Sequence, residues 1–347
     1  MNLMLPFDAG SLKPPITHRD KIMLMGSCFT EHIGNSLRDM KFNVLQNPNG
    51  IVFDAISVCN ALHSYISGEY YTEHDIFQYN GLYQSWAHHS KFSEPKAADT
   101  LEKINVQLAT AKAYLSNADW LIITFGTSYT YILNDTVPAS FKITRNAIKS
   151  SGLENAVANC HKLPGSFFDK KLVSIEDQLS VLENTIHGLL HFNPSLKIIL
   201  TVSPVRHLRD GVVNNNRSKA RLIEVVHAMV SQFQGVFYFP SYELMIDVLR
   251  DHRFYDSDLV HPNYTGTGIV LEEFARFAFE KHTQLLAEEM RQLVLARSHK
   301  PLHPDSEPHR AFLIKMLEKT KMMALQYPYL DFKEELGHFE AAVSAFN

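Results

Sequence analysis

Two short segments, far apart in the chain, hold the residue types that acyl transfer needs. The first, residues 26–31 (GSCFTE), follows an apolar run and leads into a helical pattern. The second holds Asp258 and His261, at a spacing where a carboxylate can orient the imidazole that deprotonates a nucleophile. A thiol or hydroxyl at a strand-to-helix turn, together with an Asp–His pair, predicts a covalent acyl-enzyme site.

This order of nucleophile, Asp and His resembles the SGNH/GDSL esterase superfamily and, within it, the GSCFA family. The naming motif stands here as Gly26-Ser27-Cys28-Phe29, with Thr30 in place of the usual Ala. The resemblance covers roughly residues 20–285 and extends to several further segments: Asn47–Gly50, Phe125–Thr127, Asn159–Lys162, Ser203–Arg206, Ser218-Lys219 and Arg253–Tyr255. It implies a fold and a site. It does not imply a substrate, because the family is known mainly as uncharacterised.

The nucleophile is either Cys28 or Ser27. Aligned with the superfamily's Gly-Asp-Ser-Leu-Thr-Glu, Cys28 takes the position of the attacking serine. A thiol at a helix N-terminus also gains from unpaired N–H groups and the helix dipole, which predicts a lowered pKa. A third interpretation has Cys28 as a packing residue and Ser27 as the cap of the turn.

Acyl transfer also needs donors for the developing oxyanion. The resemblance implies the N–H groups of Cys28 and Gly50. The superfamily's third donor is the Asn of a Gly-x-Asn box, but residues 126–129 read Gly-Thr-Ser-Tyr, so Ser128 stands where an Asn is usual. Asn159 could supply the amide instead, or could simply stabilise its loop.

Candidate substrate-binding residues are basic and imidazole side chains near the expected site. Arg206 and Arg209 follow a predicted strand, where guanidinium groups can hold a carboxylate or phosphate. His88, His89 and His161 lie in insertions and could form a pocket wall. No Cys-x-x-Cys, His-Glu-x-x-His or Gly-rich phosphate motif occurs, so we expect neither a metal nor a nucleotide cofactor.

Five apolar, β-rich runs predict buried strands, with helical patterns between them over 101–115, 174–190 and 217–233. The runs cover residues 22–25, 42–46, 120–125, 197–202 and 236–239. Such alternation predicts an α/β fold, a three-layer α/β/α sandwich with a five-stranded parallel sheet of flavodoxin-like order. The candidate site residues then gather at the carboxyl ends of the strands.

We expect an α/β domain over 1–285, with insertions at about 67–93 and 134–173 that are too long for ordinary loops. A helical C-terminal extension is expected over 286–347, with a break at 301–308 and a last helical segment over 310–347.

The composition of the 347-residue chain indicates which partners and which cellular compartment to expect. A net charge of −4 without a basic run argues against a nucleic-acid partner. The absence of a long apolar window argues against a membrane partner. Three cysteines suit a reducing compartment, so we expect a cytoplasmic protein. The oligomeric state cannot be inferred from the sequence.

These observations predict an SGNH-like esterase or deacylase acting on an acylated small molecule or carbohydrate. An O-acyltransferase with an acyl-CoA donor is the alternative, because a cysteine thioester passes readily to an acceptor hydroxyl. The missing Gly-x-Asn donor keeps a catalytically silent binding protein open as a third expectation.

Overall fold

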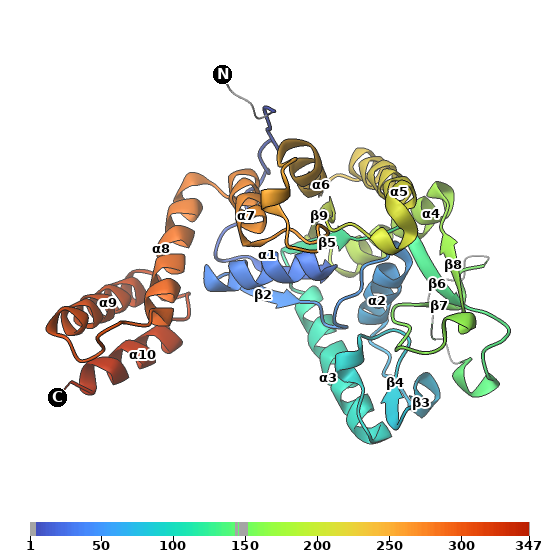
Figure 1. The fold of residues 1–347 in the computed structure, drawn as a ribbon, viewed down its shortest axis with the longest axis horizontal. Helices are drawn as coiled ribbons and strands as arrows, with labels where there is room; N and C mark the ends of the chain where they lie inside the picture. The colour runs from blue at the N-terminus through green and yellow to red at the C-terminus, as the bar shows by residue number, and fades with distance from the viewer. Residues whose placement is uncertain (1–4, 143–144, 146–151, 347) are drawn as a thin grey trace. The chain divides into compact units, whose positions relative to one another are not determined.

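The computed structural model describes residues 5–142, 145 and 152–346 (Figure 1). The chain forms two compact units. The α/β unit comprises Met1–Gly10, Lys21–Gly34 and Val44–Glu273, and the helical unit comprises Ser11–Asp20, Asn35–Asn43 and Phe274–Asn347.

The predicted five-stranded sheet is confirmed, and each apolar run forms one strand. The sheet has the order β10-β9-β5-β1-β2, and the pairs β1–β5, β5–β9 and β9–β10 are parallel. Numbered along the chain this order is 2-1-3-4-5, the flavodoxin-like arrangement. The bounds are β1 Lys21–Gly26, β2 Asn43–Gln46, β5 Trp120–Phe125, β9 Lys197–Val202 and β10 Val236–Tyr238.

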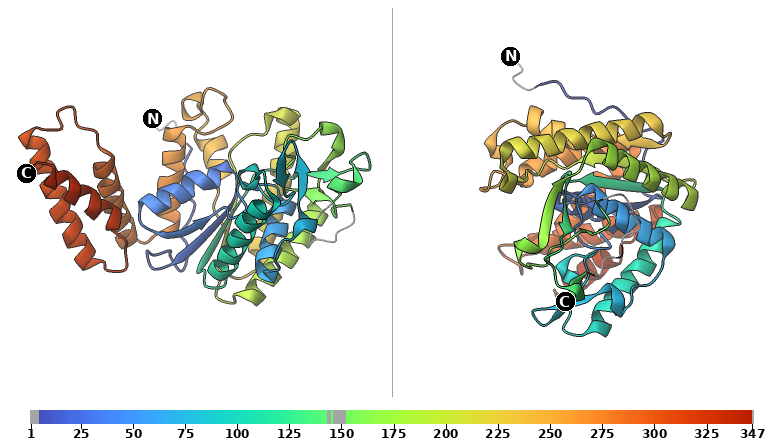
Figure 2. Two further views of the ribbon diagram at one scale, coloured as in Figure 1. Left: turned by 90° about the horizontal axis from the view of Figure 1, so that it is seen from below. Right: turned by 90° about the vertical axis from the view of Figure 1, so that its right-hand side faces the viewer.

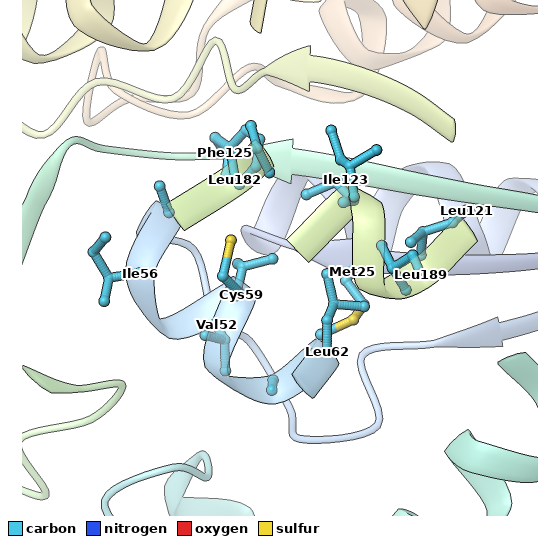
Figure 3. Close-up of a cluster of buried hydrophobic side chains, with 14 of the residues drawn as sticks. Met25, Val52, Ile56, Cys59, Leu62, Leu121, Ile123, Phe125, Leu182 and Leu189 are labelled. Atoms are coloured by element: carbon cyan, nitrogen blue, oxygen red, sulfur yellow. The ribbon is translucent and has the colours of Figure 1, made fainter. Parts of the chain in front are cut away.

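Helices flank this sheet and give the predicted α/β/α sandwich (Figure 2). Alternate strand residues such as Met25, Ile123 and Leu200 pack into one continuous core with α2, α3, α4 and α5. Figure 3 shows part of it, with Leu62 of α2 and Leu189 of α4 beside the strands. The bounds are α1 Cys28–Asp39, α2 Ala55–Ser67, α3 Ala97–Leu115, α4 Ile175–Phe192, α5 Gly211–Gln232, α6 Ser241–Glu243 and α7 Tyr264–Ala278.

Local signals define where these helices begin and end. Ser174 caps α4 by accepting a hydrogen bond from the N–H of Asp177. Asp54 caps α2 through the N–H of Ser57, and α2 ends at Gly68, whose φ of +64° suits a residue without Cβ.

The two insertions pack against each other around a small separate core. The first carries β3 (Phe77–Tyr79) and β4 (Leu82–Gln84), while β6 (Tyr129–Leu133), β7 (Ala156–Val157) and β8 (Phe168–Leu172) form an antiparallel sheet. The rings of Phe77 and Trp86 stack 4.0 Å apart, and Leu133 and Val157 join them in the insertion core. Residues 143–144 and 146–151 of the second insertion lie outside the described part of the chain.

The helical unit contains α8 (Lys281–Ser298), α9 (Glu307–Gln326) and α10 (Lys333–Ser344). The expected single segment over 310–347 is wrong, because α9 ends before Pro328, which cannot continue a helix. Leu330 and Phe332 of the resulting loop fill the core of this unit. Nowhere in the described ranges does a helix have the length and apolar character to cross a membrane.

Candidate active site

The turn from β1 into α1 requires glycine at position 26. Gly26 has φ +138°, and a Cβ there would lie 2.2 Å from the carbonyl oxygen of Thr124 on the neighbouring strand. Its N–H donates to Oδ1 of the buried Asn47 at 3.0 Å. The N–H of Ser27 donates to the same Thr124 carbonyl at 3.2 Å. The turn is therefore pinned to β5 and presents the next residue, Cys28, as the first residue of α1.

Cys28 is accessible and Ser27 is not. Cys28 is partly exposed, whereas Ser27 is 4% exposed, and its hydroxyl has no hydrogen-bond partner within the described residues. Burial raises the pKa of the Cys28 thiol, and Glu31 adds to this, while the backbone N–H groups of Phe29 and Cys28 and the charge of Lys219 lower it. The net shift is upward. The expectation of a lowered pKa is thus wrong, because burial outweighs the helix N-terminus.

Lys219 lies at this edge of the sheet, a position to which sequence reasoning gave no role. It is 1% exposed on α5, and its Nζ donates to the carbonyl oxygens of Gly126 and Ser203, both at 2.6 Å. Burial lowers the pKa of Lys219 to about 7, and Cys28 opposes that shift. The sequence could have indicated that Lys219 is buried, because Lys219 falls on the apolar face of the helix with Leu222 and Val226.

Ser128 is tied to α5 through both of its hydrogen-bond donors. Its N–H donates to Oγ of Ser218 at 2.7 Å, and its hydroxyl donates to the carbonyl of Ser218 at 2.8 Å. The hydroxyls of Thr127 and Ser218 also hydrogen bond, at 2.9 Å. In this arrangement Ser128 fixes the loop after β5, and neither of its donors is free to point at an oxyanion.

Gly50 and Asn159, the other predicted oxyanion residues, both take part in local hydrogen bonds. The N–H of Gly50 closes a turn by donating to the carbonyl of Asn47 at 2.8 Å. Oδ1 of Asn159 accepts the N–H of His161 at 2.8 Å, which stabilises its own loop. The donors that act on the Cys28 sulfur are the N–H groups of Phe29 and Cys28, and Phe29 was not among the predicted residues.

Asp258 and His261 form the predicted pair in a loop before α7. Oδ2 of Asp258 lies 2.7 Å from Nδ1 of His261. The N–H groups of His261 and Val260 donate to Oδ1 of Asp258, and these hydrogen bonds lower the pKa of Asp258 to about 2. Both side chains are nearly half exposed, at 48% and 46%. The Nδ1 contact leaves Nε2 of His261 as the ring nitrogen that can accept a substrate or thiol proton.

Asn263 and Arg206 support this loop. Nδ2 of Asn263 donates to the carbonyls of Arg253 and Tyr255, at 2.7 and 3.1 Å, and its Oδ1 accepts the N–H of Gly266. The guanidinium of Arg206 lies over the Tyr255 ring, 4.9 Å from its centroid. Arg206, predicted to bind substrate, therefore also braces the segment that leads to Asp258. Arg209 is exposed in the loop after β9.

His207 lies between these two arginines in the sequence and packs against Phe53. Its ring stacks on Phe53 with centroids 5.2 Å apart. Burial lowers the pKa of His207 to about 4, and the positive charges of Lys219 and Lys170 contribute, as does His261. His207 is thus electrostatically coupled to a lysine on α5 and to the imidazole of the Asp258 loop.

Two of the three predicted pocket-wall histidines are buried within the insertions. Nδ1 of His88 lies 3.0 Å from the Ser85 hydroxyl, and Nε2 of His161 donates to the Ser85 carbonyl at 2.8 Å. Burial lowers the pKa of His88 to about 3 and of His161 to about 4. His89 is less enclosed and interacts electrostatically with Glu31 in the first turn of α1. In the ranges that the structure describes, no group of three or more His, Cys, Asp or Glu could hold a metal ion.

Thiol reactivity gives a direct check of this geometry. We expect iodoacetamide to label Cys28 faster than Cys59 or Cys160 near pH 8. Burial raises the pKa of both other thiols to about 12, and Cys59 is fully buried. Peptide mass spectrometry over a time course measures the three rates. Faster labelling of Cys160 would contradict the site.

Comparison with known proteins gives two matches to family models. The model described as the GSCFA family matches residues 21–274, and the model described as GSCFA domain protein, C-terminal domain, matches residues 290–345. A search of curated proteins finds no match. The first match covers β1 through most of α7, and so contains Cys28, Lys219 and the Asp258–His261 pair.

Proposed function

This chain belongs to the GSCFA family, and we propose that it is an SGNH-like esterase or deacylase that works through a thioester on Cys28. One observation carries the proposal. The accessible group at the β1–α1 turn is a thiol beside two backbone N–H groups, in a unit that also presents an oriented Asp258–His261 pair. A nucleophile, a base and the orienter of that base are the three parts that acyl transfer requires.

In the proposed reaction, the Cys28 sulfur attacks the acyl carbonyl carbon while its proton passes to Nε2 of His261. The carbonyl electrons move to oxygen, and the N–H groups of Cys28 and Phe29 stabilise the resulting oxyanion. Collapse of this intermediate breaks the bond to the leaving alcohol or amine, which takes the proton from His261. Water then attacks the thioester, loses its proton to His261, and regenerates the thiol with release of the carboxylic acid.

The substrate class is an acylated small molecule or carbohydrate, bound without a cofactor. Transfer to an acceptor hydroxyl, with acyl-CoA as donor, is the second candidate, because the nucleophile is a cysteine and a thioester is reactive toward hydroxyls. The three free thiols support a reducing, cytoplasmic setting, and the net charge of −4 argues against a nucleic-acid partner.

The test is turnover of short-chain p-nitrophenyl esters and of a small acyl-CoA panel, each with and without sugar acceptors. Release of nitrophenol without an acceptor supports the esterase. Release of CoA only when an acceptor is present supports the transferase. Absence of turnover with every donor, together with no acyl adduct on Cys28 by intact-protein mass spectrometry, would overturn the proposal and favour a binding protein.

The base is tested by His261→Ala and Asp258→Asn. We expect each substitution to lower the acyl-transfer rate, by about 100-fold or more for His261→Ala, because the thiol loses its general base. Asp258→Asn removes the carboxylate that fixes the imidazole tautomer. His252→Ala and Asp256→Asn are matched controls, because both positions lie in the same exposed region. Unchanged turnover in a folded His261→Ala protein contradicts the role.

A further inference from the structure

The buried ammonium of Lys219 is held where two strands of the sheet end. Gly26 of β1 pairs with Thr124 of β5, and Cys28 and Gly126 each follow two residues later, after these adjacent parallel strands have ended. The Gly126 carbonyl accepts from Nζ of Lys219, as does the Ser203 carbonyl one residue after β9. The Lys219 side chain thus links α5 to the carboxyl ends of β5 and β9, the edge of the sheet at which α1 begins.

The hydrogen bonds of Lys219 do not balance its charge. A lysine ammonium has three N–H donors, and two of them go to neutral carbonyl oxygens. Within the described part of the chain, no carboxylate forms an ion pair with it. Burial of a charge without a counter-charge is costly, which is why burial lowers the pKa of Lys219 to about 7, and an anion nearby favours its charged form.

The titratable groups around Lys219 narrow the choice of anion. His207, in the loop after β9, is neutral or cationic and cannot provide it. The Tyr242 ring lies 5.8 Å from Nζ, and burial raises the pKa of that phenol, so it stays protonated. Cys28 interacts electrostatically with Lys219 and can become an anion, while Glu31 acts on Cys28 from within α1.

We propose that Lys219 is a positioning residue whose ammonium, anchored to the carbonyls of Gly126 and Ser203, supplies the positive charge against which Cys28 ionises. This charge stabilises the thiolate relative to the thiol. The same two hydrogen bonds hold the loops after β5 and β9 at fixed positions beside the nucleophile. The relevance to catalysis rests on the proposed function, whereas the electrostatic coupling itself does not.

Alkylation of Cys28 by iodoacetamide measures this coupling without any substrate, because only the thiolate forms the S–C bond and expels iodide. We expect Lys219→Met to move the midpoint of the labelling rate to higher pH by about one unit, which corresponds to roughly tenfold slower labelling at pH 7.5. We expect Lys219→Arg, which keeps a charge, to stay close to wild type. Lys197→Met is the matched control, because Lys197 lies at the opposite end of β9.

A reciprocal measurement leaves Lys219 in place. It tests the electrostatic coupling between Cys28 and Lys219 even if Lys219→Met does not fold. Coupling between two sites is mutual, so removal of the thiol in Cys28→Ala should lower the pKa of Lys219, as followed by NMR of its labelled ammonium. An identical pKa of Lys219 in Cys28→Ala and wild type would overturn the proposal. An unchanged labelling profile in folded Lys219→Met would do the same.

The failure of this inference can be told apart from the failure of the proposed function. If the Lys219 variants shift the labelling profile but no donor is turned over, the coupling stands and the esterase proposal falls. If turnover occurs and the labelling profile does not depend on Lys219, the proposed function stands and Lys219 is a purely structural residue.

Discussion

Cys28→Ala should lose acyl-enzyme formation completely, while Ser27→Ala should retain it. The thiol is the partly exposed group at the turn, and the Ser27 hydroxyl points into the protein at 4% exposure. Without the sulfur no covalent intermediate can form, so turnover should fall to the level of a blank. Mixing with a p-nitrophenyl ester and measuring the intact mass detects the acyl adduct directly.

Cys28→Ser is the informative intermediate. It keeps the size and position of the side chain but replaces a thiol with a hydroxyl that depends wholly on His261 for activation. We expect reduced turnover that is abolished by adding His261→Ala. An inactive Ser27→Ala protein alongside an active Cys28→Ala protein would show that Ser27 is the nucleophile.

Gly26→Ala should destabilise the fold more than any single methyl group added elsewhere on the turn. The new Cβ would stand 2.2 Å from the Thr124 carbonyl oxygen, and φ of +138° is unfavourable for any residue with a side chain. Since the obstructing atom belongs to the backbone of β5, relief requires the sheet to move. We expect a loss of roughly 3–5 kcal/mol in the free energy of unfolding, measured by urea denaturation.

Gly81→Ala separates the two causes of this loss. Gly81 also has positive φ, +76°, but a Cβ there would meet nothing within 4 Å. Its substitution should therefore cost only the backbone strain, about 1–2 kcal/mol. Equal losses for the two variants would show that the close approach to Thr124 does not contribute.

The central sheet could be predicted because its strands are nearly continuous apolar runs, a pattern that parallel strands buried on both faces impose. The start of α4 at Ser174 was also readable, because a cap acts on a residue only three positions away. The split between α9 and α10 was missed through neglect of Pro328 within an otherwise helical composition.

The site was harder to predict, because the roles of its residues depend on partners distant in sequence. Both donors of Ser128 form hydrogen bonds with Ser218, 90 residues further along the chain, which no local motif reveals. The direction of the Cys28 pKa shift depends on burial by surrounding elements, which outweighs the local helix N-terminus. A role for Lys219 became evident only from the structure, in which the sheet register places Gly126, the hydrogen-bond partner of Lys219, beside the β1–α1 turn.

The insertion core has a consequence for engineering. Phe77, Trp86 and Leu133 pack in a cluster distinct from the core beneath the five-stranded sheet. Cys28 and the Asp258–His261 pair, by contrast, belong to segments that flank that sheet. An exchange of these insertions between homologues should therefore carry Leu133 with them and keep Tyr71, Phe92 and Ala156, which pack into the core beneath the sheet. Such an exchange would change the segments around the candidate site while leaving Cys28, Asp258 and His261 in place.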